Sequence, residues 1–175
     1  SFMPLLGAGF PGIGGHVCLS LRERQSGRNL FADPGQQHGL SKTAQSFLAG
    51  IIEVVPEAFP MCAHTVNAYR RFAPGSWAPK TVSWAPYNYA AAVRTAAETE
   101  EATRLELRLP GGDVNVYLAL ALMLGAGLDG LERRLPLKDE PIGAGGPNEI
   151  PANAPRLPAD LLEATRRFRA SETAK

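Results

Sequence analysis

Residues 104–110, Arg-Leu-Glu-Leu-Arg-Leu-Pro, alternate strictly between charged and apolar side chains. In an extended strand, neighbouring side chains point to opposite faces. Arg104, Glu106 and Arg108 would therefore share one face, and the leucines between them would share the other. Two guanidinium groups around one carboxylate could line a site for an anion and a metal ion. The same face could be the solvated side of an antiparallel sheet, and the pattern alone favours that simpler interpretation.

A second alternating stretch, residues 16–21, places His16, Cys18 and Ser20 on one face. If both strands line one cavity, His16 and Glu106 could ligate a divalent ion together. An imidazole and a carboxylate would suit Mg²⁺ or Mn²⁺ only with further oxygen ligands. From the residues alone, a hydrogen-bonded core histidine is the simpler interpretation of His16.

Arginines lie near these stretches, although the whole chain has a net charge of only +1. Arg70 and Arg71 precede a Pro-Gly loop, and Arg94 lies in another predicted strand. Guanidinium groups bind carboxylates and phosphates through paired hydrogen bonds, so these arginines suggest an anionic ligand. The alternative is a set of scattered surface arginines. The glycine-rich loop at residues 7–15 matches neither a dinucleotide fingerprint nor a Walker A loop.

Helices and strands with clear patterns surround these polar stretches and must position them. Ser41 is a suitable N-cap, and Pro56 should end the helix that follows it. The segment 115–131 is apolar nearly all round, which predicts a buried helix. The fold class is α+β with antiparallel strands. The predicted strands cover residues 16–21, 81–84, 91–95 and 104–110, and the predicted helices cover 41–55, 115–131 and a final stretch from Pro158.

The composition excludes several classes of protein. The chain has 175 residues, 45% of them hydrophobic, which is enough for one domain with a core. With a net charge of +1 and no nucleic-acid motif, no nucleic-acid partner is predicted. The longest apolar run, residues 116–128, is shorter than the roughly 20 residues that a membrane span needs. Two cysteines make no disulfide framework and predict a cytoplasmic location.

Five segments, taken in order, resemble one known family. The stretch N-A-Y-R-R-F-A-P-G from residue 67 is similar to the N-S-Y-K-R-L-x-P-G segment of glutamine synthetases. Residues 104–110 resemble their R-[IL]-E-x-R-x-P strand, and residues 115–130 resemble N-P-Y-L-A-x-A-x-x-L-A-A-G-L-D-G. The glycine-rich loop into His16 resembles G-S-G-M-H-x-H-x-S-L, and residues 1–4 resemble the F-M-P-K-P segment before it.

The resemblance implies an architecture and a reaction. Residues 1–175 would be the C-terminal part of a glutamine-synthetase-like catalytic domain, with the N-terminal β-grasp domain and the first catalytic half lying outside them. The strands would form part of the family's catalytic barrel, packed by helices, in a homo-oligomeric ring. The reaction would use ATP and Mg²⁺ or Mn²⁺ to activate glutamate as γ-glutamyl phosphate, which ammonia or, in preference, an organic amine then attacks. Residues 1–175 alone would lack the remaining metal ligands and would be inactive.

The resemblance also implies roles for the metal and glutamate residues. His16 and Glu106 would ligate the metal that bridges the ATP phosphates. Arg71 and Arg108 would hold glutamate, and Gly12 would contribute backbone contacts at its α-carboxylate. Phosphoryl transfer needs positioned cations more than covalent catalysis, which agrees with these roles.

The nucleotide and amine residues follow in the same way. Arg94 and Arg104 would face the ATP phosphates, and Ser20 would lie near the nucleotide. Arg71 and Arg94 are the candidate catalytic residues. Trp77 stands where ammonia-using members carry a glutamate, and it favours a larger, less cationic amine. With Trp77 at this position, the segment resembles the branch of the family that makes γ-glutamyl amides of mono- and polyamines.

Three other positions depart from the family pattern. Tyr89 stands where an arginine touches the transferred phosphoryl group, Cys18 where a second histidine contacts ATP, and Pro11 where an asparagine touches substrate. Losing such an arginine can cost several powers of ten in rate. Two hypotheses follow: a divergent but active glutamate–amine ligase, and a degenerate, catalytically weak member with a binding, regulatory or structural role. The first is favoured because the candidate metal ligands and three of the arginines remain.

Overall fold

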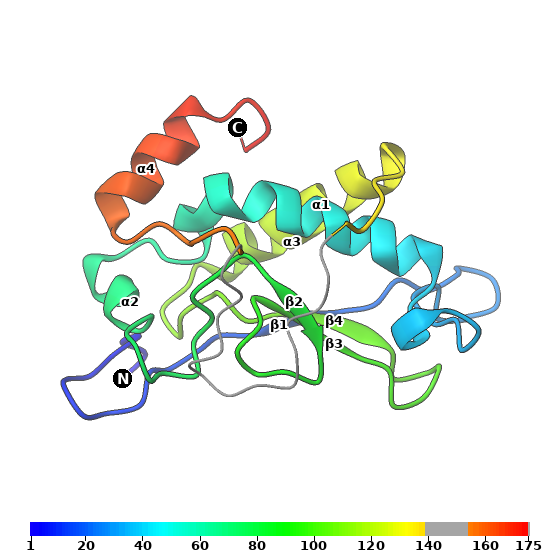
Figure 1. The fold of residues 1–175 in the computed structure, drawn as a ribbon, viewed down its shortest axis with the longest axis horizontal. Helices are drawn as coiled ribbons and strands as arrows, with labels where there is room; N and C mark the ends of the chain where they lie inside the picture. The colour runs from blue at the N-terminus through cyan, green and yellow to red at the C-terminus, as the bar shows by residue number, and fades with distance from the viewer. Residues whose placement is uncertain (139–153, 175) are drawn as a thin grey trace.

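The fold is a mixed α+β arrangement in which one four-stranded sheet packs against two long helices (Figure 1). The computed structural model describes residues 1–138 and 154–174. The predicted α+β class is confirmed. The strands are β1 (Val17–Leu19), β2 (Trp84–Pro86), β3 (Val93–Ala96) and β4 (Arg104–Leu107). The helices are α1 (Lys42–Ala58), α2 (Val66–Arg70), α3 (Val116–Glu132) and α4 (Leu161–Ala170), with short 3₁₀ turns at Gln37–Gly39 and Phe59–Met61.

The strand order is β1-β4-β3-β2, so the charged strand β4 lies inside the sheet. It pairs antiparallel with β1 on one side and with β3 on the other. In this register Cys18 and Arg94 both lie opposite Glu106. The three stretches with polar side chains therefore meet on neighbouring strands. Each strand is shorter than predicted, and the strand predicted over 81–84 lies at Trp84–Pro86 instead.

Strand β2 runs parallel to β3, so the prediction of an all-antiparallel sheet is wrong at this edge. Parallel neighbours normally need a long crossover, because the chain must return along the whole strand. Here β2 is only three residues long, and Tyr87 turns the chain with a positive φ of 54°. Residues 87–92 are therefore enough to bring the chain back beside β2.

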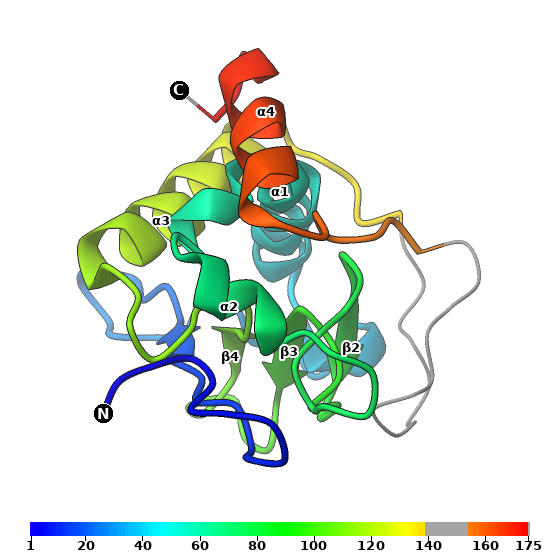
Figure 2. The ribbon, with the colours of Figure 1, turned by 90° about the vertical axis from the view of Figure 1, so that its left-hand side faces the viewer.

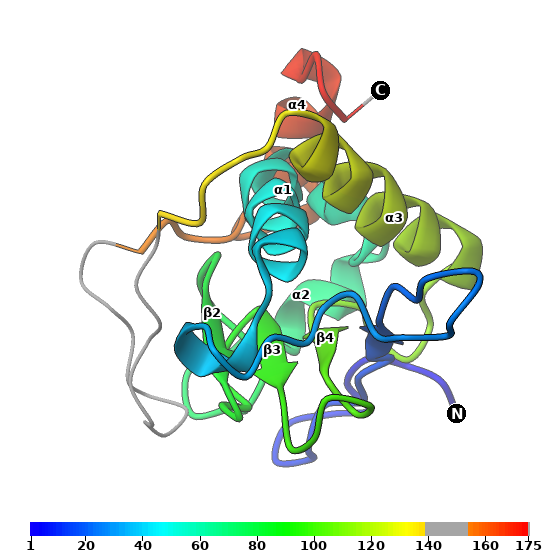
Figure 3. The ribbon, with the colours of Figure 1, turned by 90° about the vertical axis from the view of Figure 1, so that its right-hand side faces the viewer.

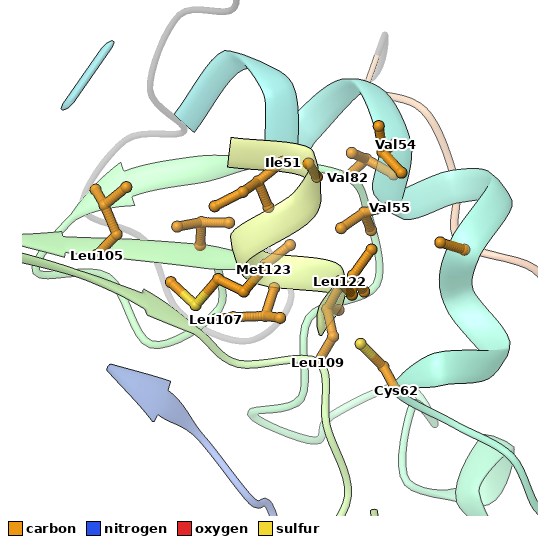
Figure 4. Packing of buried hydrophobic residues seen from close by; sticks show 14 of the residues in the cluster. Ile51, Val54, Val55, Cys62, Val82, Leu105, Leu107, Leu109, Leu122 and Met123 are labelled. Carbon is orange, nitrogen blue, oxygen red and sulfur yellow. The ribbon is translucent and has the colours of Figure 1, made fainter. Parts of the chain in front are cut away.

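The leucines of the 104–110 stretch form the sheet's contribution to the core, as the alternation predicts. Leu105, Leu107 and Leu109 are fully buried. They pack toward side chains of α1 and α3, including Ile51 and Met123 (Figure 4). Each buried leucine contributes about 1.5–3 kcal/mol of hydrophobic free energy. This burial fixes β4 in place and turns its charged face away from the helices.

Helix α1 begins as predicted and ends later than predicted. The Ser41 Oγ accepts a hydrogen bond from the Ala44 backbone N–H at 3.1 Å, which confirms the N-cap. The predicted end at Pro56 is wrong, because Pro56 lies inside the helix and the last helical residue is Ala58. A proline in the last turn removes only one backbone donor, and Ala58 is fully buried in the core. Burial therefore outweighs the lost hydrogen bond.

Helices α1 and α3 cross with their backbones in contact, and glycine allows the approach. A Cβ atom on Gly50 would lie 2.0 Å from the Ala126 carbonyl oxygen and 2.9 Å from the Gly130 Cα. Backbone atoms cannot move aside as a flexible side chain can. The crossing of the two helices therefore depends on the absence of a side chain at residue 50.

We predict that Gly50→Ala lowers the free energy of unfolding by about 2–3 kcal/mol, because overpacking forces the helices apart. Gly125→Ala is the matched control, since Gly125 is exposed on α3 and a Cβ there would meet nothing within 4 Å. In the control, alanine should stabilise the helix by about 0.5–1 kcal/mol. Urea unfolding of the complete protein measures both changes. Equal effects of the two substitutions would contradict the close crossing.

Helix α3 is covered on one face only, so the prediction of a buried helix is wrong. Ala119, Met123 and Ala126 face the core, whereas Tyr117 is 80% exposed and Leu128 is 53% exposed. Figures 2 and 3 show α3 beside α1 at the outside of the molecule. The apolar side chains on the outer face of α3 would be buried only if something outside the described residues covers this helix. None of the helices in the described part of the chain is long and apolar enough to cross a membrane.

The final helix is confirmed, although α4 begins at Leu161 and not at Pro158. Asp160 caps it, because its carboxylate accepts a hydrogen bond from the Glu163 backbone N–H at 2.8 Å. The Glu163 carboxylate in turn accepts from the Ala159 N–H at 2.8 Å. These reciprocal bonds stop the helix from extending back to the proline.

Candidate active site

The polar face of the sheet centres on Glu106, which is 4% exposed. Arg94 of β3 donates from Nε to Glu106 Oε2 at 2.9 Å and makes a second bond to the same oxygen through Nη2. Arg108 donates from Nη1 to Glu106 Oε1 at 2.5 Å. His16 lies beside this pair, with its Nδ1 3.2 Å from Glu106 Oε1. The face is therefore a buried ionic cluster and not a solvated sheet surface.

The charges in this cluster set the protonation of its members. Burial alone would raise the pKa of Glu106, but hydrogen bonds from Arg94 and Arg108 outweigh it and hold that pKa below its usual value. The pKa of His16 is lowered, first by burial and then by the positive charge of Arg108. At neutral pH the cluster thus holds a carboxylate, two guanidinium groups and a neutral imidazole. A neutral imidazole nitrogen can act as a metal ligand.

Tyr89 packs on the two arginines of the cluster. The guanidinium carbon of Arg94 lies 4.8 Å from the centre of the Tyr89 ring, and that of Arg108 lies 5.0 Å from it. The Tyr89 carbonyl oxygen also accepts a hydrogen bond from Arg108 Nε at 3.0 Å. These contacts could not be predicted from the sequence, because they depend on the turn at Tyr87 and on the parallel pairing of β2 with β3.

Arg71, directly after α2, adds a third guanidinium group close to this cluster and is buried, with 4% of its surface exposed. Its Nη2 donates to the carbonyl oxygens of Arg108, Leu109 and Pro110 at 3.2, 2.5 and 3.0 Å. Its Nε has no hydrogen-bond partner among the described residues. Burial lowers its pKa to about 10, so it remains protonated at neutral pH.

Gly12 makes room for this arginine. A Cβ atom at Gly12 would lie 2.5 Å from Cγ of Arg71. The glycine-rich loop is held against the segment that follows β4 by a hydrogen bond from Gly15 N–H to the Pro110 carbonyl at 2.9 Å (Figure 2). The contact of Gly12 is thus with the stem of Arg71, and a backbone contact with substrate stays a prediction.

A cleft of about 690 Å³ opens above Arg71 and Arg108. The glycine-rich loop forms one side and the loop 73–79 forms another. Its described lining contains basic groups but no carboxylate, and it includes large apolar side chains. The basic and aromatic members of this lining are Phe10, His16, Arg70, Arg71, Trp77 and Arg108. Positive charge beside apolar walls suits an anion that carries, or reacts with, an apolar group.

Two predicted nucleotide residues lie outside the cluster. Arg104 pairs with Glu98, with 2.9 Å between Nη1 and Oε2, near the exposed start of β4. Ser20 follows directly after β1 and is half-buried. Cys18 is exposed as a whole residue, but partial desolvation of its thiol and the nearby negative charge of Glu106 raise its pKa, so it remains a thiol at neutral pH. Of the predicted residues, the structure thus groups those for metal and glutamate with Arg94, a predicted nucleotide and catalytic residue, and leaves Arg104 and Ser20 apart.

The residues present supply part of a metal site. His16 and Glu106 face one another at a distance that one divalent ion could bridge. In the described part of the chain, no group of three or more His, Cys, Asp or Glu side chains could hold a metal. Both Glu106 oxygens already accept hydrogen bonds from arginine. Mg²⁺ prefers six ligand atoms, most of them oxygen. A metal ion held by His16 and Glu106 would therefore need further ligands from outside the described residues.

Comparison with known proteins identifies the family. The family model described as "Glutamine synthetase, catalytic domain" matches residues 1–175. The chain belongs to the glutamine synthetase family. A type-1 glutamine synthetase 2 from Dictyostelium discoideum is 36% identical over 177 residues, which cover 100% of this chain and 34% of that protein. The resemblance seen in the five segments is therefore confirmed.

Two further relatives in the glutamine synthetase family are named for organic amines. A gamma-glutamylethanolamide synthetase from Streptomyces coelicolor is 39% identical over 160 residues, covering 91% of this chain and 33% of that protein. A glutamate–isopropylamine ligase from a Pseudomonas species is 37% identical over 175 residues, covering 100% of this chain and 38% of that protein. The chain spans about a third of the length of these relatives.

Proposed function

We propose that the complete protein is an ATP-dependent glutamate–amine ligase that forms γ-glutamyl phosphate and transfers the γ-glutamyl group to an organic amine. The observation that carries this proposal is the group of buried guanidinium groups at the cleft. Arg71 and Arg108 line a cleft whose described walls hold no carboxylate. Guanidinium groups are the preferred partners of carboxylates and phosphates. The names of two relatives, given above, support an organic amine as acceptor.

The positions of the glutamate and metal residues support the roles that this proposal gives them. Arg71 and Arg108 bind glutamate, and Gly12, which leaves room for the side chain of Arg71, contributes backbone contacts at the α-carboxylate. His16 and Glu106 hold Mg²⁺ or Mn²⁺ with ligands from the rest of the protein. When bound, the metal neutralises charge on the phosphate groups of ATP. Substrate would bind through the guanidinium N–H groups that do not donate to Glu106 or to the backbone carbonyls.

The nucleotide lies toward β3 and the start of β4 in this proposal. Arg94 contacts the phosphates and acts with Arg71 as a catalytic residue, because cationic donors stabilise the charge that develops during phosphoryl transfer. Arg104 and Ser20 extend the site along the sheet. Arg104 would exchange its exposed pair with Glu98 for a phosphate, and exposed pairs contribute little to stability.

The proposal includes the larger architecture. Residues 1–175 are placed as the C-terminal part of the catalytic domain, with the β-grasp domain and the first catalytic half outside them, in a cytoplasmic homo-oligomeric ring. The sheet is open among the described residues, with β1 and β2 at its edges. Strands from the rest of the protein would extend it into a barrel. The exposed apolar face of α3 supports this, because such a face favours a covering partner.

Phosphate release by the complete protein with ATP, glutamate and a panel of amines tests the function. We predict greater kcat/KM with ethylamine, isopropylamine or putrescine than with ammonia, because Trp77 supplies an indole where ammonium would need a carboxylate. Trp77→Glu should shift the ratio of ammonia to ethylamine turnover toward ammonia by about tenfold, roughly the value of one charge-assisted contact. Leu162→Glu is the matched control, since Leu162 is 60% exposed on α4.

The alternative is a degenerate family member with a binding, regulatory or structural role. The observation in its favour is that both Glu106 oxygens are occupied by arginine, while Tyr89 brings no charge. No phosphate release with any amine, together with a gain of activity in Tyr89→Arg, would favour this alternative over the ligase.

A further inference from the structure

Tyr89 contacts both arginines of the ionic cluster although it is itself half-exposed, with 52% of its surface accessible. It belongs to the loop between β2 and β3, and the positive φ of Tyr87 sets the direction of that loop. Its ring covers the guanidinium groups of Arg94 and Arg108 at 4.8 and 5.0 Å, and its carbonyl accepts from Arg108. Because half of Tyr89 remains exposed, its contacts with two cations, and not burial in the core, characterise its environment.

The ring of Tyr89 offsets an imbalance of charge in the cluster. Arg94 and Arg108 both donate to Glu106, so two positive charges lie beside a single negative one. The face of an aromatic ring is electron-rich and attracts cations placed over it. A guanidinium group stacks through its face and hydrogen-bonds through its edge. Stacking on Tyr89 therefore stabilises the two arginines and leaves their N–H edges available.

We propose that Tyr89 is a positioning residue, whose ring holds Arg94 and Arg108 so that their edges bind Glu106 and an anionic group of the substrate. The inference rests on the proposed function in taking that group to be a carboxylate or phosphoryl group at the cleft. The aromatic ring is the active part of the side chain, and its hydroxyl is not required. A neutral residue at position 89 thus supports an anion site by ordering two cations.

The test compares four changes in the complete protein. Tyr89→Leu and Tyr89→Met remove the ring and retain apolar bulk, and Tyr89→Phe keeps the ring and removes the hydroxyl. Leu162→Ala is the control, because Leu162 is 60% exposed on α4 and does not line the cleft. Because Tyr89 is half-exposed, the thermal midpoint of each variant should stay close to that of the unsubstituted protein, and circular dichroism checks this.

We expect Tyr89→Leu and Tyr89→Met to raise the glutamate KM about tenfold, the effect of losing cation–π contacts of ordinary strength. Their kcat should fall by a smaller factor. Tyr89→Phe should stay within about threefold of the unsubstituted protein in both constants. If the leucine variant behaves like the Leu162→Ala control, or if phenylalanine is as damaging as leucine, the inference is wrong.

Calorimetry separates this inference from the proposed function. Binding of L-glutamate and of inorganic phosphate is measured for the same proteins without turnover. Should the protein release no phosphate with any amine, the ligase proposal fails, yet weaker anion binding in the leucine variant than in the phenylalanine variant still supports the role of Tyr89. Equal binding in these variants, or no binding of either anion to the unsubstituted protein, would overturn it.

Discussion

Replacing Glu106 by glutamine should both destabilise the protein and remove most of its activity. The substitution keeps the shape of the side chain but leaves Arg94 and Arg108 side by side without a negative charge. Their side chains are 14% and 8% exposed, so water cannot replace the lost carboxylate. Removing one partner of a buried ion pair costs about 3–5 kcal/mol. We expect a loss of that size in the free energy of unfolding of Glu106→Gln.

The activity of Glu106→Gln should fall by about a thousandfold or more, because the arginines lose the group that orients them and the proposed metal loses a ligand. Urea unfolding and phosphate release measure the two effects. Glu53→Gln is the control, since it breaks an exposed pair of Glu53 with Arg133, whose Oε1 and Nη1 lie 2.6 Å apart. Exposed pairs contribute little, so the control should change neither quantity. A Glu106 variant as stable and active as this control would refute the central place of the carboxylate.

The local pattern of the sequence predicts the core-facing half of the site. In residues 104–110, alternation alone places the leucines in the core and the charged side chains on the opposite face, and the structure agrees. That alternation cannot tell whether the charged face is wet or buried. The answer depends on the neighbours of β4, because Arg94 and His16 reach Glu106 only through strand pairing over long stretches of sequence.

The features that sequence reasoning missed all depend on tertiary contacts. The parallel placement of β2 follows from the shortness of that strand and from a turn at Tyr87. Pro56 remains helical because core burial outweighs one missing hydrogen bond. The apolar pattern of α3 indicates burial, but it cannot say which chain provides it. The stacking of Tyr89 on two arginines needs both the turn and the sheet order.

Arg71→Lys should abolish most glutamate binding while keeping a positive charge at the same place. The guanidinium of Arg71 donates to three backbone carbonyls through one nitrogen, so its orientation is fixed and its other donors remain for a ligand. A lysine is shorter, and its ammonium has no planar fork to match a carboxylate. Losing two charge-assisted bonds at about 1.5–3 kcal/mol each should raise the glutamate KM by about a hundredfold or more.

Arg70→Lys is the matched control, because Arg70 is the neighbouring arginine, lines the same cleft and is exposed. If charge in the cleft were enough, both variants would retain glutamate binding, since both keep a positive charge. If the fixed fork of Arg71 matters, only Arg71→Lys should lose it. Glutamate binding unchanged in Arg71→Lys would make Arg71 a structural link between α2 and the segment after β4. Anion recognition would then rest on Arg94 and Arg108, the two arginines that Tyr89 holds.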